Sequence, residues 1–553
     1  MKEEMKSLYV AIVLSLAVIL ATNWLFPTKK TEQNNVDTNI EVVSNEPLVA
    51  NEEEPILSTD DALKADKRIP LENLSLVGSL RLKGARFDDL NLRKYKQTLD
   101  PNSEDVQLLK PALSNNPYYA EFGLLSSDAS IKLPDASTVW SQKGKKLSPD
   151  TPLLLEWNNG QGLKFIRKIS IDDNYMFTIE QIVENNTAKD VTLYPYALVN
   201  RTLSASEGRT KVVHEGMVGV IDSTLKEIKL DDFKKKEKQE FSSEGGWLGF
   251  SDHYWLSALI LNNNTKSKVK FAKTAENSYQ ADFVGEPIKI DAGSVGTFNG
   301  KFFAGAKEIK LLDSYAKNLD IDKFDLAVDF GWYYFLTKPF FYILDFLYHM
   351  IGNMGWAILL FAALLRLAMF PVANKSFESM SKMKKVQPKI QELQDKFKND
   401  KNKLQQEMMN LYRKEKINPA SGCLPMLIQI PVFFSLYKVL NIAIEIRQAP
   451  FVGWIKDLSA PDPLTISAIT HLPLPSFLDI GLWPILMGLT MYIQQKLNPK
   501  PANKDQARMF ALMPIVFMFM LGHFASGLVI YWTLSNILSI LQQRVIMKKL
   551  GVD

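Results

Sequence analysis

Residues 354–372 read MGWAILLFAALLRLAMFPV, an apolar stretch that carries a single charge, Arg366. Its length suits a membrane-spanning helix, which needs about 20 such residues. An arginine near the middle of a span costs roughly 2.5 to 3.5 kcal/mol on insertion scales unless water or a partner relieves the cost. We therefore interpret Arg366 as the mark of a wet cavity inside the membrane. The alternative is that its side chain simply extends to the cytosolic interface.

Similar apolar stretches predict the rest of a polytopic membrane domain. We expect helices at about residues 354–372, 424–446, 480–496, 509–524 and 527–546, within a region that extends over residues 351–549. Residues 1–27 hold a further apolar run that is too long for a signal peptide and lacks a cleavage pattern, so we interpret it as a transmembrane signal anchor. Residues 28–55 are rich in Asn and acidic side chains, which is typical of a flexible linker.

Residues 56–325 show a different pattern, in which apolar and polar side chains alternate. KFIRKISI (164–171) and WLSALIL (255–261) are examples, and Asn-Asn and Gly-Gly pairs separate such runs. This period of two predicts a large antiparallel all-β sandwich. The aromatic-rich residues 326–350 then predict an amphipathic helix that lies in the headgroup layer.

Basic residues indicate the orientation in the membrane. Residues 374–421 are rich in Lys and Arg, as are the ends of the later loops, and such loops stay in the cytosol. The β-domain is then periplasmic, and both termini are cytosolic, including a short tail at residues 550–553. Within the basic loop, two amphipathic segments predict a helical hairpin. Its apolar side chains Met380, Met383, Met408 and Leu411 either receive apolar substrate segments or only pack the two helices together.

Composition excludes several classes of function. A formal charge of +4 is too small to indicate DNA binding, and the only cysteine, Cys423, excludes an internal disulfide. The five histidines are scattered, no metal-ligand spacing or Gly-rich phosphate loop appears, and the spans hold almost no carboxylates. We therefore expect no catalytic residues, no metal site and no cofactor, and so no enzyme.

Two other functions stay open on the residues alone. One is a membrane-tethered periplasmic carbohydrate-binding protein or enzyme, which needs paired carboxylates, or a histidine with a carboxylate, in a cleft of the sandwich. His214 and His253 are the histidines of that region that could serve. The other is a solute carrier that uses Arg366 as an anion site.

Long motifs then recur in a known order: GGWLGFSDHYWLSALI (245–260), LLRLAMFPVANKSFESMSKMKKVQPKIQELQDKF (364–397), EMMNLYRKEKINPASGCLPMLIQIPVFFSLYKVL (407–440), WPILMGLTMYIQQK (483–496) and SGLVIYWTLSNILSILQQ (526–543). The chain resembles the YidC/Oxa family of membrane protein insertases in its Gram-negative form with a large periplasmic domain. The resemblance implies a multi-domain fold: an all-β periplasmic supersandwich and an α-helical membrane domain of six transmembrane helices, with a five-helix insertase core and a cytosolic helical hairpin.

The resemblance also implies a hydrophilic groove within the membrane. Arg366 falls at the position of the family's groove arginine, and Gln429, Phe433, Gln494, Tyr531 and Trp532 fall at other lining positions. Ala362, one turn before Arg366, replaces a hydroxyl that some relatives carry. The implied function is to insert and help fold integral proteins of the bacterial inner membrane, alone or with the Sec translocon. Implied partners are nascent membrane-protein chains, SecYEG, SecDF, the ribosome, the signal recognition particle pathway and the lipid bilayer.

Overall fold

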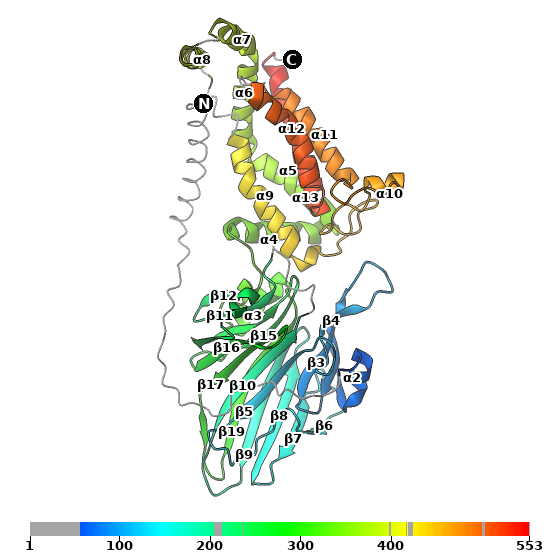
Figure 1. The fold of residues 1–553 in the computed structure, drawn as a ribbon, viewed down its shortest axis with the longest axis vertical. Helices are drawn as coiled ribbons and strands as arrows, with labels where there is room; N and C mark the ends of the chain where they lie inside the picture. Colours follow the sequence, from blue (N-terminus) through cyan, green and yellow to red (C-terminus); the bar gives the residue numbers. More distant parts are fainter. Residues whose placement is uncertain are drawn as a thin grey trace. The chain divides into compact units, whose positions relative to one another are not determined.

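A β-rich part precedes a helical part in this chain (Figure 1). The computed structural model describes residues 56–203, 213–234, 236–397, 400–415, 417, 424–499 and 504–551. This order confirms the predicted combination of an all-β domain with an α-helical domain. The predicted signal anchor at 1–27 and linker at 28–55 lie outside the described residues, as does the end of the predicted tail at 550–553.

Two antiparallel sheets form the β-rich part. In the described residues the first has ten strands, in the order β1-β2-β3-β5-β10-β17-β16-β13, with β4 beside β3 and β18 beside β10. They are β1 (Arg68–Glu72), β2 (Leu76–Arg81), β3 (Arg86–Lys96), β4 (Asp105–Leu109), β5 (Tyr118–Leu125), β10 (Val191–Thr202), β13 (Lys238–Glu244), β16 (Lys266–Ala275), β17 (Ser278–Gly285) and β18 (Ile288–Ile290).

The second sheet follows the order β12-β11-β14-β15-β19-β9-β8-β7-β6, nine strands within the described part. They are β6 (Ser141–Lys143), β7 (Leu153–Asn158), β8 (Leu163–Ile171), β9 (Met176–Asn185), β11 (Gly216–Ile221), β12 (Thr224–Ile228), β14 (Gly246–Ser251), β15 (Trp255–Ile260) and β19 (Val295–Ala306). Short helices accompany the sheets: α2 (Thr59–Ala65), η1 (Leu230–Lys234), α3 (Ile309–Asn318) and η2 (Phe324–Ala327).

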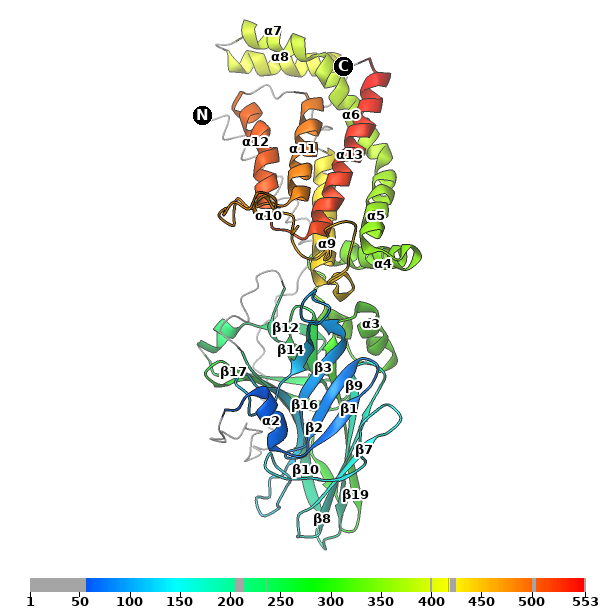
Figure 2. The same ribbon diagram turned by 90° about the vertical axis from the view of Figure 1, so that its right-hand side faces the viewer.

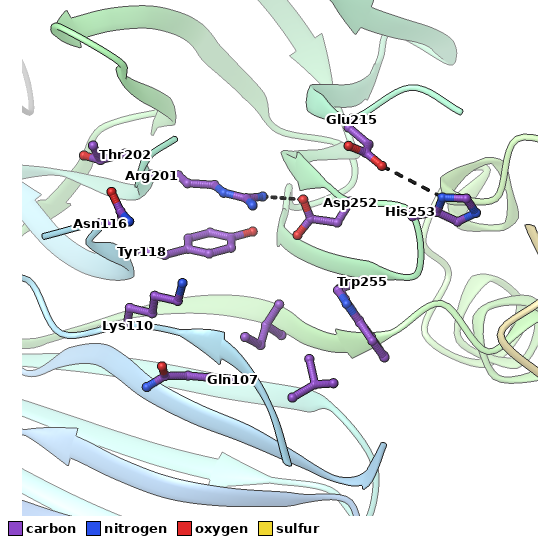
Figure 3. A pocket seen from close by; sticks show the side chains of 12 residues that line it. Gln107, Lys110, Asn116, Tyr118, Arg201, Thr202, Glu215, Asp252, His253 and Trp255 are labelled. Carbon is purple, nitrogen blue, oxygen red and sulfur yellow. Dashed lines mark hydrogen bonds and ion pairs between the residues drawn. The ribbon is translucent and has the colours of Figure 1, made fainter. Parts of the chain in front are cut away.

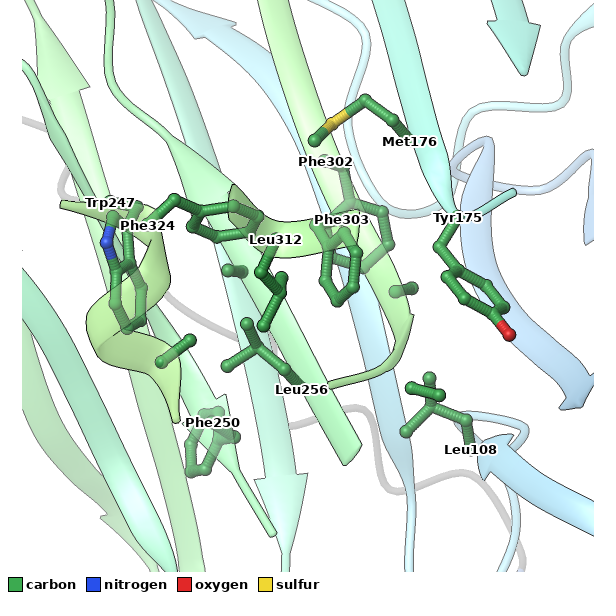
Figure 4. Close-up of a cluster of buried hydrophobic side chains, with 14 of the residues drawn as sticks. Leu108, Tyr175, Met176, Trp247, Phe250, Leu256, Phe302, Phe303, Leu312 and Phe324 are labelled. Atoms are coloured by element: carbon green, nitrogen blue, oxygen red, sulfur yellow. The ribbon is translucent and has the colours of Figure 1, made fainter. Parts of the chain in front are cut away.

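The predicted alternation is visible in the strands, because every second residue of β8 is buried. Large aromatic rings fill the core, and Phe302 packs against Phe177 with ring centroids 6.0 Å apart. Leu312 of α3 and Phe324 of η2 cover the same core beside Phe303 (Figure 4). The short helices therefore close one region of the sandwich.

The helical part consists of one amphipathic helix followed by a bundle. Its elements are α4 (Tyr334–Ile351), α5 (Met354–Ala368), α6 (Phe370–Lys385), α7 (Gln387–Lys396), α8 (Lys401–Lys414), α9 (Leu424–Ile442), η4 (Ile444–Ile446), α10 (Ile466–Thr470), α11 (Leu482–Leu497), α12 (Lys504–Met520) and α13 (Ser526–Lys549). Helix α13 is central, because it packs against α5, α6, α9 and α11. Helices α7 and α8 pair with each other beyond the end of α6 (Figure 2).

The stretch that carries Arg366 is shorter as a helix than its apolar run. Helix α5 begins at the cap of Asn353, whose side chain accepts a hydrogen bond from Trp356 N, and ends at Ala368. Pro371 lies in the first turn of α6, where an N–H group would have no intrahelical partner. Proline therefore favours the start of a new helix at this position. The two helices meet at an angle of 67°.

A membrane span requires a helix that is both long and apolar. Within the described ranges, no single helix meets both requirements, although α5 and α6 meet them as a bent pair. Residues 427–442 and 507–520 form shorter apolar helices. The six spans and their orientation remain predictions.

Candidate functional site

Arg366 lies near the C-terminal end of α5, half-buried. Its guanidinium carbon is 5.7 Å from the centre of the Phe377 ring on α6. Nε and Nη2 are buried, and neither has a hydrogen-bond partner among the described residues. Buried donors of a charged group are almost always satisfied, so water or a bound group is expected here. Ala362, one turn earlier, is buried in the apolar core.

Two other predicted groove residues lie near this guanidinium. Gln429 of α9 donates a hydrogen bond from Nε2 to the hydroxyl oxygen of Tyr531 on α13, at 3.0 Å. Tyr531 is 2% exposed, and its helix α13 packs against α5, which carries Arg366. Side chains from α5, α9 and α13 therefore form one polar group inside the bundle.

Aromatic side chains lie beside these polar side chains. Phe433 follows Gln429 by one turn of α9, and its ring centroid is 4.7 Å from that of Trp532 on α13. Trp532 also contacts Phe517 of α12, at 5.8 Å. The structure thus brings together five of the six predicted groove residues.

Gln494 is the sixth, half-buried on α11. Within the described residues no hydrogen bond joins it to the other five. Its neighbour Gln495 donates from Nε2 to the carbonyl oxygen of Phe510 on α12. Position 495 therefore links two helices, and the groove role of Gln494 stays a prediction.

Further polar contacts join elements of the bundle, and the sequence indicated only some of their residues. Asn536 of α13 donates from Nδ2 to Thr490 Oγ1 of α11 at 3.1 Å, and Gln543 donates from Nε2 to Asn498 Oδ1 at the same distance. Gln542 donates to Asn374 Oδ1 of α6 at 2.8 Å. Asn374 and Asn498 lie outside the predicted spans, so a search for polar residues within spans could not find them.

The hairpin residues mostly pack the hairpin itself. Met383, Met408 and Leu411 lie against the buried side chains Val386, Ile390 and Ile417, between α7 and α8 and the end of α6. Met380 instead packs in a small cluster with Phe377 and Ile546. This arrangement corresponds to the packing alternative that the sequence left open.

One hairpin methionine that sequence reasoning passed over faces outward. Met409 of α8 is 44% exposed. It borders a shallow cavity of about 170 Å³ that is also lined by Leu404, Gln405, Met408 and Tyr412. A flexible thioether beside an apolar cavity suits varied apolar partners.

A larger cavity of about 290 Å³ lies in the β-rich part (Figure 3). Arg201 Nη1 is 2.6 Å from Asp252 Oδ1, and its guanidinium lies over the Tyr118 ring. Glu215 Oε1 is 3.9 Å from Nδ1 of His253, too far for a hydrogen bond. Charges of both signs therefore line the cavity.

His253 is one of the two histidines, with His214, on which a carbohydrate-active enzyme could depend. Burial lowers the pKa of His253, so its imidazole is neutral near pH 7. Nε2 lies 2.6 Å from the carbonyl oxygen of Asn441, which it can contact only as an N–H donor. Since Nδ1 is not hydrogen-bonded to Glu215, the cavity does not present the activated pair that such catalysis needs.

Comparisons with known proteins bear on the whole chain. Residues 68–343 match the family described as YidC periplasmic domain, and residues 346–552 match the 60Kd inner membrane protein family. A membrane protein insertase YidC of Beijerinckia indica subsp. indica is 45% identical over 586 residues, covering 100% of this chain and 97% of the relative. Its counterpart in Rickettsia felis is 46% identical over 560 residues, covering 99% and 100%.

A crystal structure of an active YidC insertase with its first transmembrane domain resolved is 18% identical and covers 86% of this chain and 92% of that chain, with a TM-score of 0.37. The two family matches are separated by two residues and follow the order of the β-rich and helical parts. By these matches and by its full-length relatives, the chain belongs to the YidC family of inner-membrane protein insertases that carry a periplasmic domain.

Proposed function

We propose that this insertase moves polar ends of its substrates through a hydrophilic groove lined by α5, α9, α11 and α13. Arg366, Gln429, Phe433, Gln494, Tyr531 and Trp532 are the proposed lining. The observation that carries the proposal is the pair of buried nitrogens on Arg366 of α5 that have no hydrogen-bond partner among the described residues. An arginine keeps its proton, so these donors must be satisfied by water or by substrate.

The groove would lower the free-energy cost of moving a hydrophilic segment through the apolar interior of the bilayer. A short hydrophilic tail enters from the cytosol, and Arg366 with the Gln429–Tyr531 pair replaces part of its lost hydration. The adjoining apolar segment then slides into lipid, driven by roughly 25 cal/mol for each Å² removed from water. An acidic tail gains most from the guanidinium, although an ion pair in a wet groove is worth only about 1 kcal/mol or less.

The hairpin formed by α7 and α8 would receive substrate before the groove does. The exposed Met409 and the cavity beside it are the surface we assign to this contact, since Met383, Met408 and Leu411 are occupied in packing. Met380 would act indirectly by holding α6 against α13.

The remaining parts of the proposal concern topology and partners. We place both termini and the hairpin in the cytosol and the β-rich part in the periplasm, because the Lys-rich loops follow the positive-inside rule. We also propose that the chain works alone or with the Sec translocon, including SecYEG and SecDF, and receives nascent chains from the ribosome and the signal recognition particle pathway. Family membership and the basic hairpin support these assignments.

Substituting Arg366 tests the groove. With Arg366→Ala in purified proteoliposomes, insertion of a substrate with a short acidic translocated tail should fall roughly 5-fold, equivalent to about 1 kcal/mol. Insertion of a matched substrate with an apolar tail should change little. Arg366→Lys is the control, because it keeps the charge and should retain intermediate activity. Equal activity of wild type and Arg366→Ala on both substrates would show that the guanidinium has no direct role.

A further inference from the structure

Residues 465–481, between η4 and α11, form a closed loop. A β-bridge between Thr465 and Gly481 joins its ends, and Ile466 N donates to the carbonyl oxygen of Ile480 at 3.1 Å. His523, just beyond α12, contacts the carbonyl oxygen of Ser476 at 2.9 Å. The loop therefore lies where α11 begins and α12 ends, with α10 projecting from the bundle (Figure 1).

A single carboxylate holds the shape of this loop. Asp479 accepts hydrogen bonds from Ser467 N at 2.8 Å, from Ser467 Oγ at 2.5 Å and from Thr465 Oγ1 at 2.9 Å. These contacts join the two sides of the loop near its base. Asp479 therefore ties residues 465 and 467 to the opposite side of the loop.

That tip is apolar and faces outward. Ile469, Leu472 and Phe477 are 53%, 59% and 65% exposed, although large apolar side chains are normally buried. Between Thr465 and Leu478, His471 is the one side chain of the sequence that can carry a charge. Three exposed large apolar side chains within nine residues indicate an interaction surface.

Several backbone N–H groups of the tip donate hydrogen bonds within the loop. Ile469 N donates to the carbonyl oxygen of Thr465, His471 N to that of Ser467, and Leu478 N to that of Pro475. Leu472 N donates to Thr470 Oγ1, and Pro473 and Pro475 have no N–H at all. These contacts satisfy four of the eight N–H groups of residues 469–478, which removes part of the hydration cost of placing this segment against lipid.

We propose that residues 469–478 enter the headgroup and upper acyl layer of the lipid bilayer, in the outer leaflet. The proposal rests on the proposed function, in which α11 and α12 cross the membrane. Those helices expose apolar side chains of their own, including Leu489, Ile515, Val516 and Met520, and Met520 ends the helix that His523 follows. The loop continues this apolar surface outward and would fix the depth of α11 and α12.

Depth-dependent quenching tests the proposal. In a Cys423→Ser background, Leu472→Cys and Phe477→Cys are labelled with an NBD fluorophore and reconstituted in phosphatidylethanolamine–phosphatidylglycerol vesicles. Nitroxide-labelled lipids should quench both sites, and aqueous iodide should quench them several-fold less than a control. The matched control is Leu99→Cys, an apolar side chain of the β-rich part that is 54% exposed. Since all three side chains are exposed, these changes leave the packing intact.

Quenching by iodide at 472 and 477 as strong as at 99, without quenching by nitroxide lipid, would overturn the proposal. Protection in native membranes but not in these vesicles would do the same and would indicate a protein partner. Insertion assays on the same vesicles distinguish failure of the loop proposal from failure of the proposed function. Active insertase with an unquenched loop refutes the loop proposal alone, whereas a lipid-quenched loop without insertion counts against the proposed function alone.

Discussion

Two buried cations in this chain meet the cost of burial in different ways. Lys307 follows β19, and its ammonium donates to Ser251 Oγ at 3.0 Å, with Asp252 and Glu215 nearby. Burial nevertheless lowers the pKa of Lys307 to about 8. A lysine can lose its proton under such conditions, whereas an arginine cannot. Arg366 therefore keeps a permanent demand for hydration, which is what a groove for polar tails needs.

The pKa of Lys307 predicts how stability depends on pH. Between about 8 and its ordinary value of 10.5 the unfolded chain binds this proton and the folded chain does not, so stability rises with pH across that interval. The rise amounts to roughly 3 kcal/mol by linkage. Lys307→Met should remove this component and raise the melting temperature at pH 7, followed by the circular dichroism of the sheets.

The matched control is Lys268→Met on β16, an exposed lysine that should alter neither quantity. A wild-type curve parallel to that of Lys307→Met from pH 8 to 10.5 would contradict the assignment. The burial of Lys307 could not be predicted from the sequence, since lysines are usually exposed. Arg366 was identifiable because a charge in an apolar run stands out, but its contact with Phe377 depends on the bend between α5 and α6.

At the scale of elements, the hairpin separates two roles for methionine. Met409→Ser should lower insertion roughly 5-fold, by the loss of about 1 kcal/mol of apolar contact, and should leave hairpin structure unchanged. Met383→Ser removes a packed side chain and should instead make α7 and α8 more sensitive to proteolysis. Insertion kinetics and limited proteolysis of both variants measure the difference. Normal insertion by Met409→Ser would exclude the assigned receiving surface.

Element boundaries were predictable where one residue type determines them. Asp400 caps α8 by accepting from Lys403 N, at the break expected between the two amphipathic segments, and Pro388 lies in the first turn of α7. The functions of the methionines were not predictable, because Met408 and Met409 are neighbours in sequence and line the same cavity, yet Met408 also packs inside the hairpin whereas Met409 is 44% exposed. The surroundings of each face of α8 are decided by how the helix packs, and both faces of this helix carry apolar residues.

At the scale of the molecule, α4 joins the β-rich part to the bundle. Lys338 pairs with Asp313 at 3.0 Å and with Asp325 at 2.9 Å, both from the β-rich side. Phe340 of the same helix packs on Phe361 of α5, with ring centroids 5.0 Å apart. The domain order was visible in the sequence as a change from period two to long apolar runs. The pairing of Asp313 and Asp325 with Lys338 was not predictable, because both acids lie before α4 in ordinary polar segments.

These contacts predict which parts of the chain insertion requires. A variant that lacks residues 56–325 loses Asp313 and Asp325 but keeps α4 and the ion pair between Asp329 and Lys438 of α9. It should retain most insertion activity in cells depleted of the native insertase, because the proposed groove belongs to the bundle. Extending the deletion through residue 350 removes the Phe340–Phe361 contact and should abolish insertion. Complete loss in the shorter deletion, with the bundle still resistant to protease, would mean that the β-rich part acts in insertion itself.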